Sequence, residues 1–159
     1  MLSQTAEYAL RTILFIAQRS KEAGPVQTEA IAEALDIPRN YLSKILHRLA
    51  QEGVLKSTRG RGGGFVLTRP SDQMPLVDVV GLFDQIAPGR QCLLGRPVCS
   101  DAHACDAHAS WKDVSERVAH FFSDTSVADL MGHAEPRVKA PGGARARKGP
   151  KRPAAARPR

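Results

Sequence analysis

Apolar positions recur at helical spacing three times in the first third of the chain. The first run predicts a helix over residues 4–19, which Gly24-Pro25 ends. Thr28 can cap a second, short helix, and residues 36–38 connect it tightly to a third helix over 38–52. The positions expected to be buried are Ala6, Ala9, Leu10, Ile13, Leu14 and Ile16 in the first helix, Ile31 and Leu35 in the second, and Leu42, Ile45, Leu46 and Leu49 in the third.

A pair of short strands is predicted directly after the third helix. Gly53 ends that helix, and residues 54–57 and 65–68 are short strand-like runs. Residues 58–64 between them contain four glycines and predict a hairpin tip. Two helices joined by a tight turn and followed by a hairpin have the order of a winged helix-turn-helix. The predicted fold class is therefore mainly α with a small β-hairpin wing.

The second half of the chain contains a long stretch without an apolar period. A helix is predicted over residues 76–86, and another begins near Ser110 and is followed by a capping run, residues 123–125, and a last helical turn over 127–131. Residues 87–108 lie between the two helices, and a stretch this long in a compact domain is usually functional or disordered. We name it the cysteine segment because it holds all three cysteines of the chain.

Composition divides the chain near residue 132. Residues 133–159 hold nine of the 23 Lys and Arg residues and one acid, a net charge of +8, whereas residues 1–132 hold 14 bases and 15 acids, a net charge of −1. The tail is rich in Pro, Ala and Gly, so it cannot bury enough apolar surface to become ordered. We predict a single domain over 1–131 and a disordered basic tail over 132–159. Two interpretations of this tail stay open: it is attracted to DNA phosphates, or it is only a solvated extension.

Several other protein classes receive no support from the sequence. No apolar run of about 18 residues predicts a membrane span, and the first residues lack the pattern of a secretion signal, so we expect a cytoplasmic protein without a membrane partner. An odd number of cysteines in a reducing compartment argues against a disulfide framework. Paired carboxylates, a nucleophile–base pair and a dinucleotide fingerprint are also missing. We therefore expect no enzyme and no small-molecule substrate, and keep a small redox carrier as an alternative.

The predicted winged helix carries polar side chains where DNA would be contacted. The second helix of such a pair enters the major groove, and the hairpin tip reaches the neighbouring backbone or minor groove. An ordinary solvated helix face has the same composition, so the order of elements, and no single residue, favours DNA. The candidate contacts are Thr28, Arg39, Asn40, Ser43, Lys44 and His47 around the third helix, and Arg59, Arg61 and Gly63 at the wing tip.

The spacing of the cysteines leaves three interpretations open. Cys92, Cys99 and Cys105 are separated by six and five residues, and His108 follows after two more. There is no Cys-x2-Cys knuckle of the kind that is typical of structural zinc, although three thiolates and another ligand could still hold zinc. Soft thiolates in a polar segment also suit an iron–sulfur cluster. The third interpretation is three unrelated thiols.

Four stretches together resemble the Rrf2 family of bacterial winged-helix transcription regulators, in particular its IscR-like and NsrR-like iron–sulfur members. The resemblance covers about residues 1–131 and leaves out the tail. The stretches are Thr5-Ala6-Glu7-Tyr8-Ala9-Leu10-Arg11, Arg39-Asn40-Tyr41-Leu42-Ser43-Lys44-Ile45-Leu46, the wing run from Ser57 to Leu67, and the cysteine segment continuing to Trp111-Lys112-Asp113.

The resemblance implies how a cluster would be held. Its ligands would be Cys92, Cys99 and Cys105, in a 2Fe-2S or 4Fe-4S cluster. The fourth ligand would be His108 by similarity to IscR-like members, or Glu7 of the other subunit by similarity to NsrR-like members. We favour His108 because it is close to Cys105 in sequence. The gap between the first two cysteines is one residue longer than in IscR-like members, so cluster type and ligand geometry stay open.

The resemblance also implies a homodimer and its activity. The dimer helix would be residues 109–123, with Trp111, Val114, Val118 and Phe121 at the seam; burial of these four within one chain is the alternative. Such a dimer would bind a pseudo-palindromic operator in double-stranded DNA. The function implied is a repressor whose operator binding responds to redox state, nitric oxide or iron–sulfur status. A cluster-free, thiol-based regulator of the same family and a zinc-stabilised binding module are the alternatives.

Overall fold

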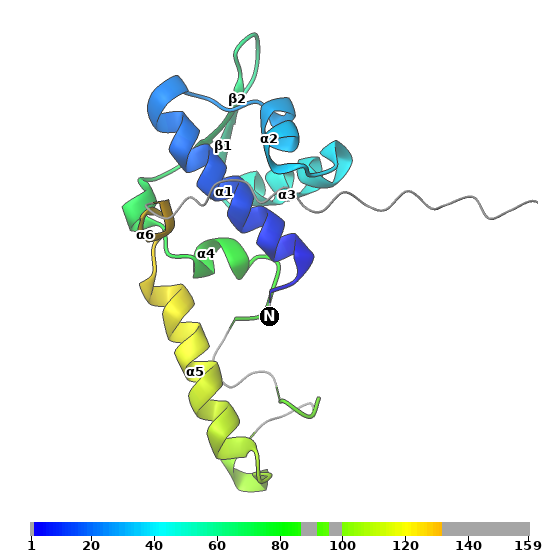
Figure 1. The fold of residues 1–159 in the computed structure, drawn as a ribbon, viewed down its shortest axis with the longest axis vertical. Coiled ribbons are helices and arrows are strands. Elements are labelled where there is room, and N and C mark those ends of the chain that lie inside the picture. Colours follow the sequence, from blue (N-terminus) through cyan, green and yellow to red (C-terminus); the bar gives the residue numbers. More distant parts are fainter. Residues whose placement is uncertain (1, 87–91, 96–99, 132–159) are drawn as a thin grey trace, which may run out of the picture.

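The chain folds into a helical body from which one long helix projects (Figure 1). The computed structural model describes residues 2–86, 92–95 and 100–131, so the tail over 132–159 lies outside the described residues. The elements are α1 (Gln4–Ala23), α2 (Thr28–Leu35), α3 (Arg39–Gln51), β1 (Leu55–Thr58), β2 (Gly64–Leu67), the short 3-10 turn η1 (Ser71–Gln73), α4 (Val77–Val80), a second 3-10 turn η2 (Asp101–His103), α5 (His108–Asp124) and α6 (Val127–Met131). This confirms the predicted fold class, mainly α with a β-hairpin wing.

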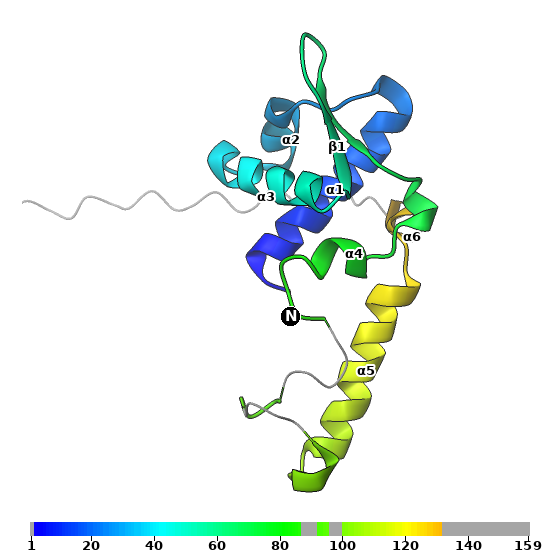
Figure 2. The same ribbon diagram turned by 180° about the vertical axis from the view of Figure 1, so that it is seen from behind.

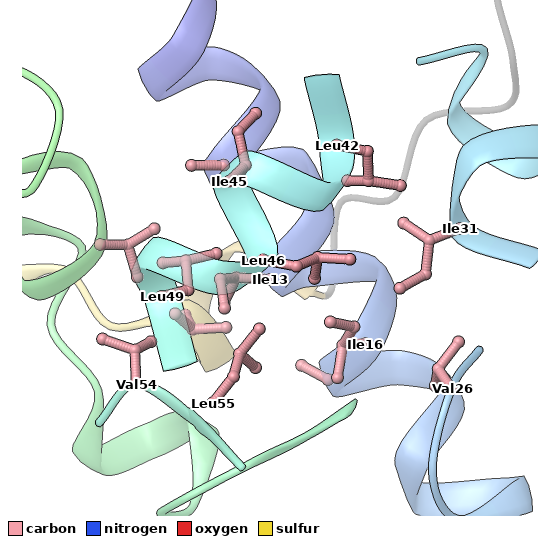
Figure 3. Packing of buried hydrophobic residues seen from close by; sticks show 14 of the residues in the cluster. Ile13, Ile16, Val26, Ile31, Leu42, Ile45, Leu46, Leu49, Val54 and Leu55 are labelled. Carbon is pink, nitrogen blue, oxygen red and sulfur yellow. The ribbon is translucent and has the colours of Figure 1, made fainter. Parts of the chain in front are cut away.

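The core forms where the apolar faces of α1, α2 and α3 meet. Figure 3 shows Ile13 and Ile16 of α1 beside Leu46 and Leu49 of α3, with Ile31 of α2 closing one side. All five are at most 1% exposed. The helical period of the sequence therefore identified the buried faces of these helices, because burying those faces is what holds the helices together. Leu10, Leu14 and Leu35 are only partly buried at the edge of this core.

The ends of α1 follow from local chemistry. The hydroxyl of Ser3 accepts a hydrogen bond from the backbone N–H of Ala6 (3.2 Å), which caps the first turn. Gly24 follows the last residue with a φ of 75°, a conformation that favours glycine, so the helix ends there. The helix thus extends four residues beyond the predicted 4–19, up to the predicted glycine.

The connection between α2 and α3 is a tight left-handed turn. Asp36 has a φ of 54°, and the N–H of Ile37 donates to the carbonyl of Ala32 (3.1 Å). The predicted cap of α2 is wrong, because Thr28 is already the first helical residue and Gln27 before it makes no capping side-chain bond. Arg11 of α1 donates to the carbonyl of Leu35 (3.1 Å) and so holds this turn against α1.

The wing is an antiparallel hairpin in a fixed register. Leu55 pairs with Leu67 and Thr58 with Gly64, one residue away from the predicted strand limits. The backbone of Phe65 also exchanges hydrogen bonds with Val26 (2.8 and 3.0 Å), which anchors the wing beside the start of α2. A Cβ atom on Gly64 would lie 2.4 Å from the carbonyl oxygen of Val26, so this close approach requires glycine.

The predicted helix over residues 76–86 is wrong in length. Only Val77–Val80 is helical, and the chain continues as turns in which the N–H of Phe83 bonds the carbonyl of Val80 at the tighter i−3 spacing (3.0 Å). Gly81 is a poor helix former at the point where the helix stops. Asp84 then accepts a hydrogen bond from the backbone N–H of Ser3 (2.7 Å), which directs the chain toward the start of α1.

Helix α5 projects from the body, and the chain returns to it through α6. The N–H of Leu76 donates to Thr125 (2.9 Å) and the N–H of Val127 donates to Met74 (2.8 Å), so the end of α5 is fixed to the segment before α4. Ser126, and no residue of the predicted run 123–125, caps α6 through reciprocal bonds with Asp129. Figures 1 and 2 both show α5 pointing away from the wing. In the part of the chain that is described, no helix is long and apolar enough to cross a membrane.

Candidate nucleic-acid interface and cysteine segment

One face of α3 is entirely polar and faces solvent. Leu42, Ile45, Leu46 and Leu49 occupy the buried face, which fixes the rotation of the helix. The predicted contacts therefore all lie on exposed positions: Arg39, Asn40, Ser43, Lys44 and His47. Donors and acceptors near the start of a helix, on the face turned away from the core, are the groups that can reach base edges in the major groove.

Two of these side chains already have partners within the chain. Arg39 forms an ion pair with Glu29 of α2, and the two side chains are 64% and 55% exposed. The hydroxyl of Ser43 donates to the carbonyl of Arg39 (2.8 Å), one turn earlier in the helix. Thr28, the other predicted contact on α2, is half-buried. The pairing of Glu29 with Arg39 was not predicted from the sequence. The available signal was an acidic residue in the first turn of the helix before α3.

A shallow hollow extends the polar face of α3 toward α1. It has a volume of about 340 Å³ and is lined by Gln4, Tyr8, Pro38, Asn40, Tyr41 and Lys44. Tyr41 packs edge-on against Tyr8, with ring centroids 5.9 Å apart, and its hydroxyl is hydrogen-bonded to that of Thr5 (2.5 Å). These contacts fix the start of α3 relative to the start of α1.

The wing tip presents its two arginines to solvent. Arg59 and Arg61 are exposed, and the hairpin reaches beyond α2 in both views (Figures 1 and 2). Gly60 and Gly62 have φ values of 101° and 84°, which side chains other than glycine rarely adopt. Gly63 has no room for a side chain, because a Cβ atom there would lie 2.3 Å from the carbonyl oxygen of Thr58. The glycines thus set the tip geometry that displays the arginines.

The apolar face of α5 is largely uncovered within this chain. Val114, Val118 and Phe121 are 48%, 46% and 52% exposed, and Trp111 is half-buried. A cavity of about 680 Å³ runs along this face between α5 and the start of the chain. Its lining is Leu2, Ser3, Asp84, Gln85, Ile86, Trp111, Val114, Ser115, Val118 and Phe122. Burial within one chain, the alternative considered for these four residues, therefore does not account for Val114, Val118 and Phe121.

The described parts of the cysteine segment are two short turns. The carbonyl of Cys92 accepts from the N–H of Gly95 (2.9 Å), and the carbonyl of Cys105 accepts from the N–H of His108 (2.8 Å) at the start of α5. Cys92 and Cys105 are half-buried, and the side chain of His108 is 11% exposed. Cys99 lies outside the described residues. Within the described residues, no group of three or more His, Cys, Asp or Glu side chains is placed to hold a metal ion, so the structure does not bring Cys92, Cys105 and His108 together as a site; the set that includes Cys99 stays untested.

His108 is held by a carboxylate that the sequence prediction did not include. Its Nε2 lies 2.8 Å from Oδ1 of Asp101 in η2, and Lys112 donates to both carboxylate oxygens (3.3 and 3.1 Å). The hydrogen bonds from His108 and then from Lys112 lower the pKa of the Asp101 carboxyl. A carboxylate between the last two cysteines was the available signal, since metal-binding histidines usually have such a partner.

Glu7, the alternative fourth ligand, lies in another part of the molecule. It is exposed on α1 and approaches Arg11 (Nη1 to Oε1, 3.9 Å). In Figures 1 and 2 the first turns of α1 and the start of α5 are well separated. Within one chain, Glu7 and His108 are therefore not brought together.

Comparison with known proteins decides the family. The model of the Rrf2 family, described as an iron-dependent transcriptional regulator, matches residues 2–133. This chain belongs to the Rrf2 family. It is 32% identical over 134 residues to the HTH-type transcriptional regulator IscR of Photorhabdus laumondii, covering 84% of this chain and 80% of the relative. It is 31% identical to IscR of Escherichia coli O1:K1, covering 84% and 82%. The chain is accordingly a DNA-binding transcription regulator of a non-enzymatic family.

Solved structures share the Rrf2 fold. CymR, the global cysteine regulator of B. subtilis, superposes with a TM-score of 0.73 at 20% identity, covering 85% of this chain and 98% of CymR. IscR of T. potens superposes with a TM-score of 0.67 at 22% identity, covering 89% and 93%. At such identities the likeness concerns the fold. It supports the overall fold described above, which these structures share over most of the chain.

Proposed function

We propose that this Rrf2 regulator is a homodimer that binds a pseudo-palindromic operator and is controlled by an iron–sulfur cluster. The observation that carries the DNA-binding part is the joint display of the α3 polar face and the wing arginines. Arg39, Asn40, Ser43, Lys44 and His47 would read base edges, while Arg59 and Arg61 would enter the minor groove or contact the backbone. Thr28 and the backbone of Gly63 would contact phosphates.

The proposed dimer uses α5 of each subunit. Three large apolar side chains on one helix, each 46–52% exposed, are unusual unless another surface covers them. A second copy of this face would bury Val114, Val118 and Phe121 together with Trp111 in a symmetric contact. Two recognition helices would then be presented in two-fold symmetry, which matches a pseudo-palindromic site.

The proposed cluster ligands are Cys92, Cys99, Cys105 and His108. The donor types of the described residues suit a cluster, because Cys92 and Cys105 offer thiolates and His108 offers an imidazole three residues after Cys105. Iron bound by these ligands would supply reactivity toward oxidants and nitric oxide. Loss of the cluster when iron is scarce would change operator binding in the same way. Glu7 of the partner subunit is the alternative fourth ligand.

The structure offers a contact through which the cysteine segment could affect DNA binding. Asp84, just before this segment, holds the N–H of Ser3 at the start of α1 (2.7 Å). Helix α1 packs on α3 and on α4. A change in the order of the cysteine segment would therefore bias how α1 and α3 are placed. Such a signal shifts the population of DNA-binding states only by the difference in its affinity for them.

A cluster-free, thiol-based regulator is the second candidate. The specific observation in its favour is the fold likeness to CymR, of which an oxidized form from Staphylococcus aureus superposes with a TM-score of 0.67 at 18% identity. In this candidate the half-buried Cys105 thiol would be the oxidisable group. Zinc on the same thiolates is a further variant, and metal analysis separates it from iron.

Three further features belong to the same proposal. Repression follows if the dimer occupies an operator that overlaps a promoter. The basic residues of 133–159 would add a salt-sensitive, sequence-independent attraction to DNA phosphates, with an inert extension as the alternative. The domain over 1–131 would suffice for operator choice, and the cytoplasm, where thiols stay reduced, is the proposed location.

The experiment that tests the cluster proposal is an anaerobic preparation with its absorbance, iron, zinc and sulfide measured. We expect iron and sulfide in the wild type and loss of the visible absorbance in Cys92→Ala, with the helical far-UV spectrum unchanged. Ser100→Ala is the matched control in the same segment and should keep its absorbance. Retained absorbance in Cys92→Ala would show that Cys92 is not a ligand, and a colourless wild type would favour the thiol-based candidate.

A further inference from the structure

A hollow lies between the first turns of α1 and α3, beside the polar face that we propose contacts DNA. It has a volume of about 340 Å³, and Gln4 and Tyr8 of α1 line it together with Asn40 and Lys44 of α3. In Figures 1 and 2 the starts of α1 and α3 lie on the same side of the body. A helix that reads base edges in the major groove brings the residues around it against the sugar–phosphate backbone. With α3 in the groove, the hollow therefore opens where the backbone of the duplex would run.

Two hydrogen-bond donors of the hollow have no acceptor among the described residues. The amide of Gln4 donates to the hydroxyl of Tyr8 (3.0 Å), so the hydroxyl oxygen already accepts and its own hydrogen is left for another acceptor. Lys44 is exposed and forms no ion pair in the described part of the chain. Its ammonium has several hydrogens to donate, so it can contact a phosphate as well as a base edge.

The charge around the hollow favours an anion. None of the described lining residues is acidic. The guanidinium of Arg11 lies over the Tyr8 ring, with its Cζ 5.9 Å from the ring centroid. The neighbouring acid, Glu7, approaches that guanidinium (3.9 Å), so Arg11 offsets its charge. Lys44 then adds a positive charge at the hollow itself, which attracts a phosphate.

The rest of the lining suits a deoxyribose. Pro38 and the rings of Tyr8 and Tyr41 contribute apolar surface. The two rings pack edge-on (5.9 Å), and the hydroxyl of Tyr41 is hydrogen-bonded to that of Thr5 (2.5 Å). The shape of the hollow is therefore set before DNA arrives, which lowers the cost of binding. Apolar surface beside phosphate donors matches a sugar–phosphate unit, whereas a base edge carries no charge.

We propose that the hollow between α1 and α3 holds one sugar–phosphate unit of the DNA backbone. The Tyr8 hydroxyl and the Lys44 ammonium donate to the phosphate, and Gln4 orients the hydroxyl. The Tyr41 ring lies against the deoxyribose. This inference rests on the proposed function, since it needs α3 in the major groove. It adds α1, which the sequence prediction did not include, as a contact element that fixes the angle between α3 and the groove.

The first test compares variants of the full chain on an operator duplex that the wild type selects from a random-sequence library. We expect Tyr8→Phe, which keeps the ring, to weaken operator binding about tenfold, because a hydrogen bond to a charged group is lost. Its slope of log K against log salt should equal that of the wild type, since no positive charge is removed. Gln4→Ala, at an exposed position, should weaken binding in the same direction. Unchanged operator affinity in both variants overturns the proposal.

Substitution of Lys44 tests the charge of the contact. We expect Lys44→Gln to lower the same salt slope by about 0.9, the value for one phosphate contact. Arg117→Gln removes a positive charge from an exposed position on α5 and should leave the slope unchanged. Urea unfolding of each variant shows whether the fold is retained. A slope that is equal in Lys44→Gln and wild type overturns the role of Lys44 at a phosphate.

A third measurement identifies the group that occupies the hollow. Single methylphosphonates, each of which replaces a charged phosphate oxygen by a methyl group, are placed in turn along the operator duplex. We expect a position in each half-site where this change weakens wild-type binding but costs Tyr8→Phe at least about twofold less, because groups in contact do not act additively. Gln51→Ala, at the far end of α3, should respond there as the wild type does. Coupling of Tyr8→Phe to a base substitution, and to no phosphate, overturns the proposal.

The outcomes separate this inference from the proposed function. A wild type that selects no sequence from the library overturns operator binding and this inference together. A wild type that selects an operator, but has no phosphate position coupled to Tyr8→Phe, overturns this inference alone and leaves α3 and the wing as the contact elements.

Discussion

At the scale of single residues, an ion pair engages one of the side chains that we propose contacts DNA. Arg39 stands at the start of α3, where an arginine could contact a guanine or a phosphate, yet its partner in this structure is Glu29. Both side chains are more than half exposed, so the pair adds little to folding stability. Its effect should instead fall on DNA binding, because a phosphate must compete with Glu29 for the same guanidinium.

The first prediction concerns Glu29. We expect Glu29→Gln to raise the affinity for non-specific duplex DNA and to steepen the slope of log K against log salt by about 0.9, the value for one added phosphate contact. Fluorescence anisotropy over a salt series measures both. Glu33→Gln removes the same charge from an exposed position one turn further along α2 and should change the slope less. A slope that is the same in Glu29→Gln and wild type would contradict the competition.

Another prediction concerns Thr12, a fully buried residue of α1. Its hydroxyl has no hydrogen-bond partner among the described residues. An unsatisfied buried hydroxyl is costly, so Thr12→Val, which nearly keeps the shape, should raise the free energy of unfolding by about 1 kcal/mol. Urea unfolding of the wild type and Thr12→Val measures this. Thr12→Ser keeps the hydroxyl, removes a methyl group and should be destabilised; a less stable valine variant would show that the hydroxyl is satisfied in solution.

At the scale of elements, sequence periodicity was sufficient where a buried face determines a helix. The α3 prediction differs from the structure by only one residue at each end, because Leu42, Ile45, Leu46 and Leu49 all face one core and so define the helix. The α4 prediction is wrong in length, because apolar residues around Gly81 pack in turns as well as in a helix, and apolar spacing does not distinguish the two. Contacts between side chains of two different elements, such as Glu29 with Arg39 and Asp101 with His108, leave no periodic signal in the sequence.

The wing gives a prediction at this scale. We expect Arg59→Ala to weaken operator binding by about 1–3 kcal/mol, the usual contribution of an arginine that reads a groove. An electrophoretic shift titration with the operator measures the loss. Arg117→Ala removes a positive charge from α5, on the side away from the wing, and should have a much smaller effect. A loss of only a few tenths of a kcal/mol in Arg59→Ala would place the wing tip outside the interface.

The cap of α6 predicts a pH dependence. Hydrogen bonds from the hydroxyl and then the backbone N–H of Ser126 lower the pKa of Asp129 below its usual value. The folded state therefore favours the ionised carboxylate. Its contribution to stability is present above the unfolded pKa and is lost as the pH falls through the folded pKa.

Thermal unfolding of the wild type and Asp129→Asn from pH 7 down to the acid range checks this dependence. The two proteins should differ most at neutral pH and converge as the carboxyl protonates. Asp72→Asn, at an exposed position in η1, is the control. A stability difference for Asp129→Asn that grows toward low pH would contradict the assigned role of the carboxylate.

At the scale of the whole molecule, two sets of hydrogen bonds among the described residues connect the winged-helix body to the chain on either side of the cysteine segment and α5. The bond between Asp84 and Ser3 connects the chain just before the cysteine segment to the start of α1. The strand-like contacts of residues 74–76 with 125–127 connect the end of α5 to the body. In the proposed function, a chemical event at the cysteine segment would pass through these contacts and change the placement of α3. The sequence predicts a DNA-contacting surface and a cysteine site, because each has its own residue pattern, whereas the bonds that connect them could be seen only in the folded chain.

The central claim, that the state of the cysteine segment controls operator occupancy, has one direct test. Operator affinity is measured by anisotropy for anaerobic protein with its cluster and for the same preparation after iron removal, with Cys92→Ala as a protein that cannot reload. We predict an affinity change of at least tenfold between the two forms, about 1.4 kcal/mol, and no response to iron removal in Cys92→Ala. A preparation without iron or sulfide that binds its operator normally, or equal affinities of the two forms, would contradict the account.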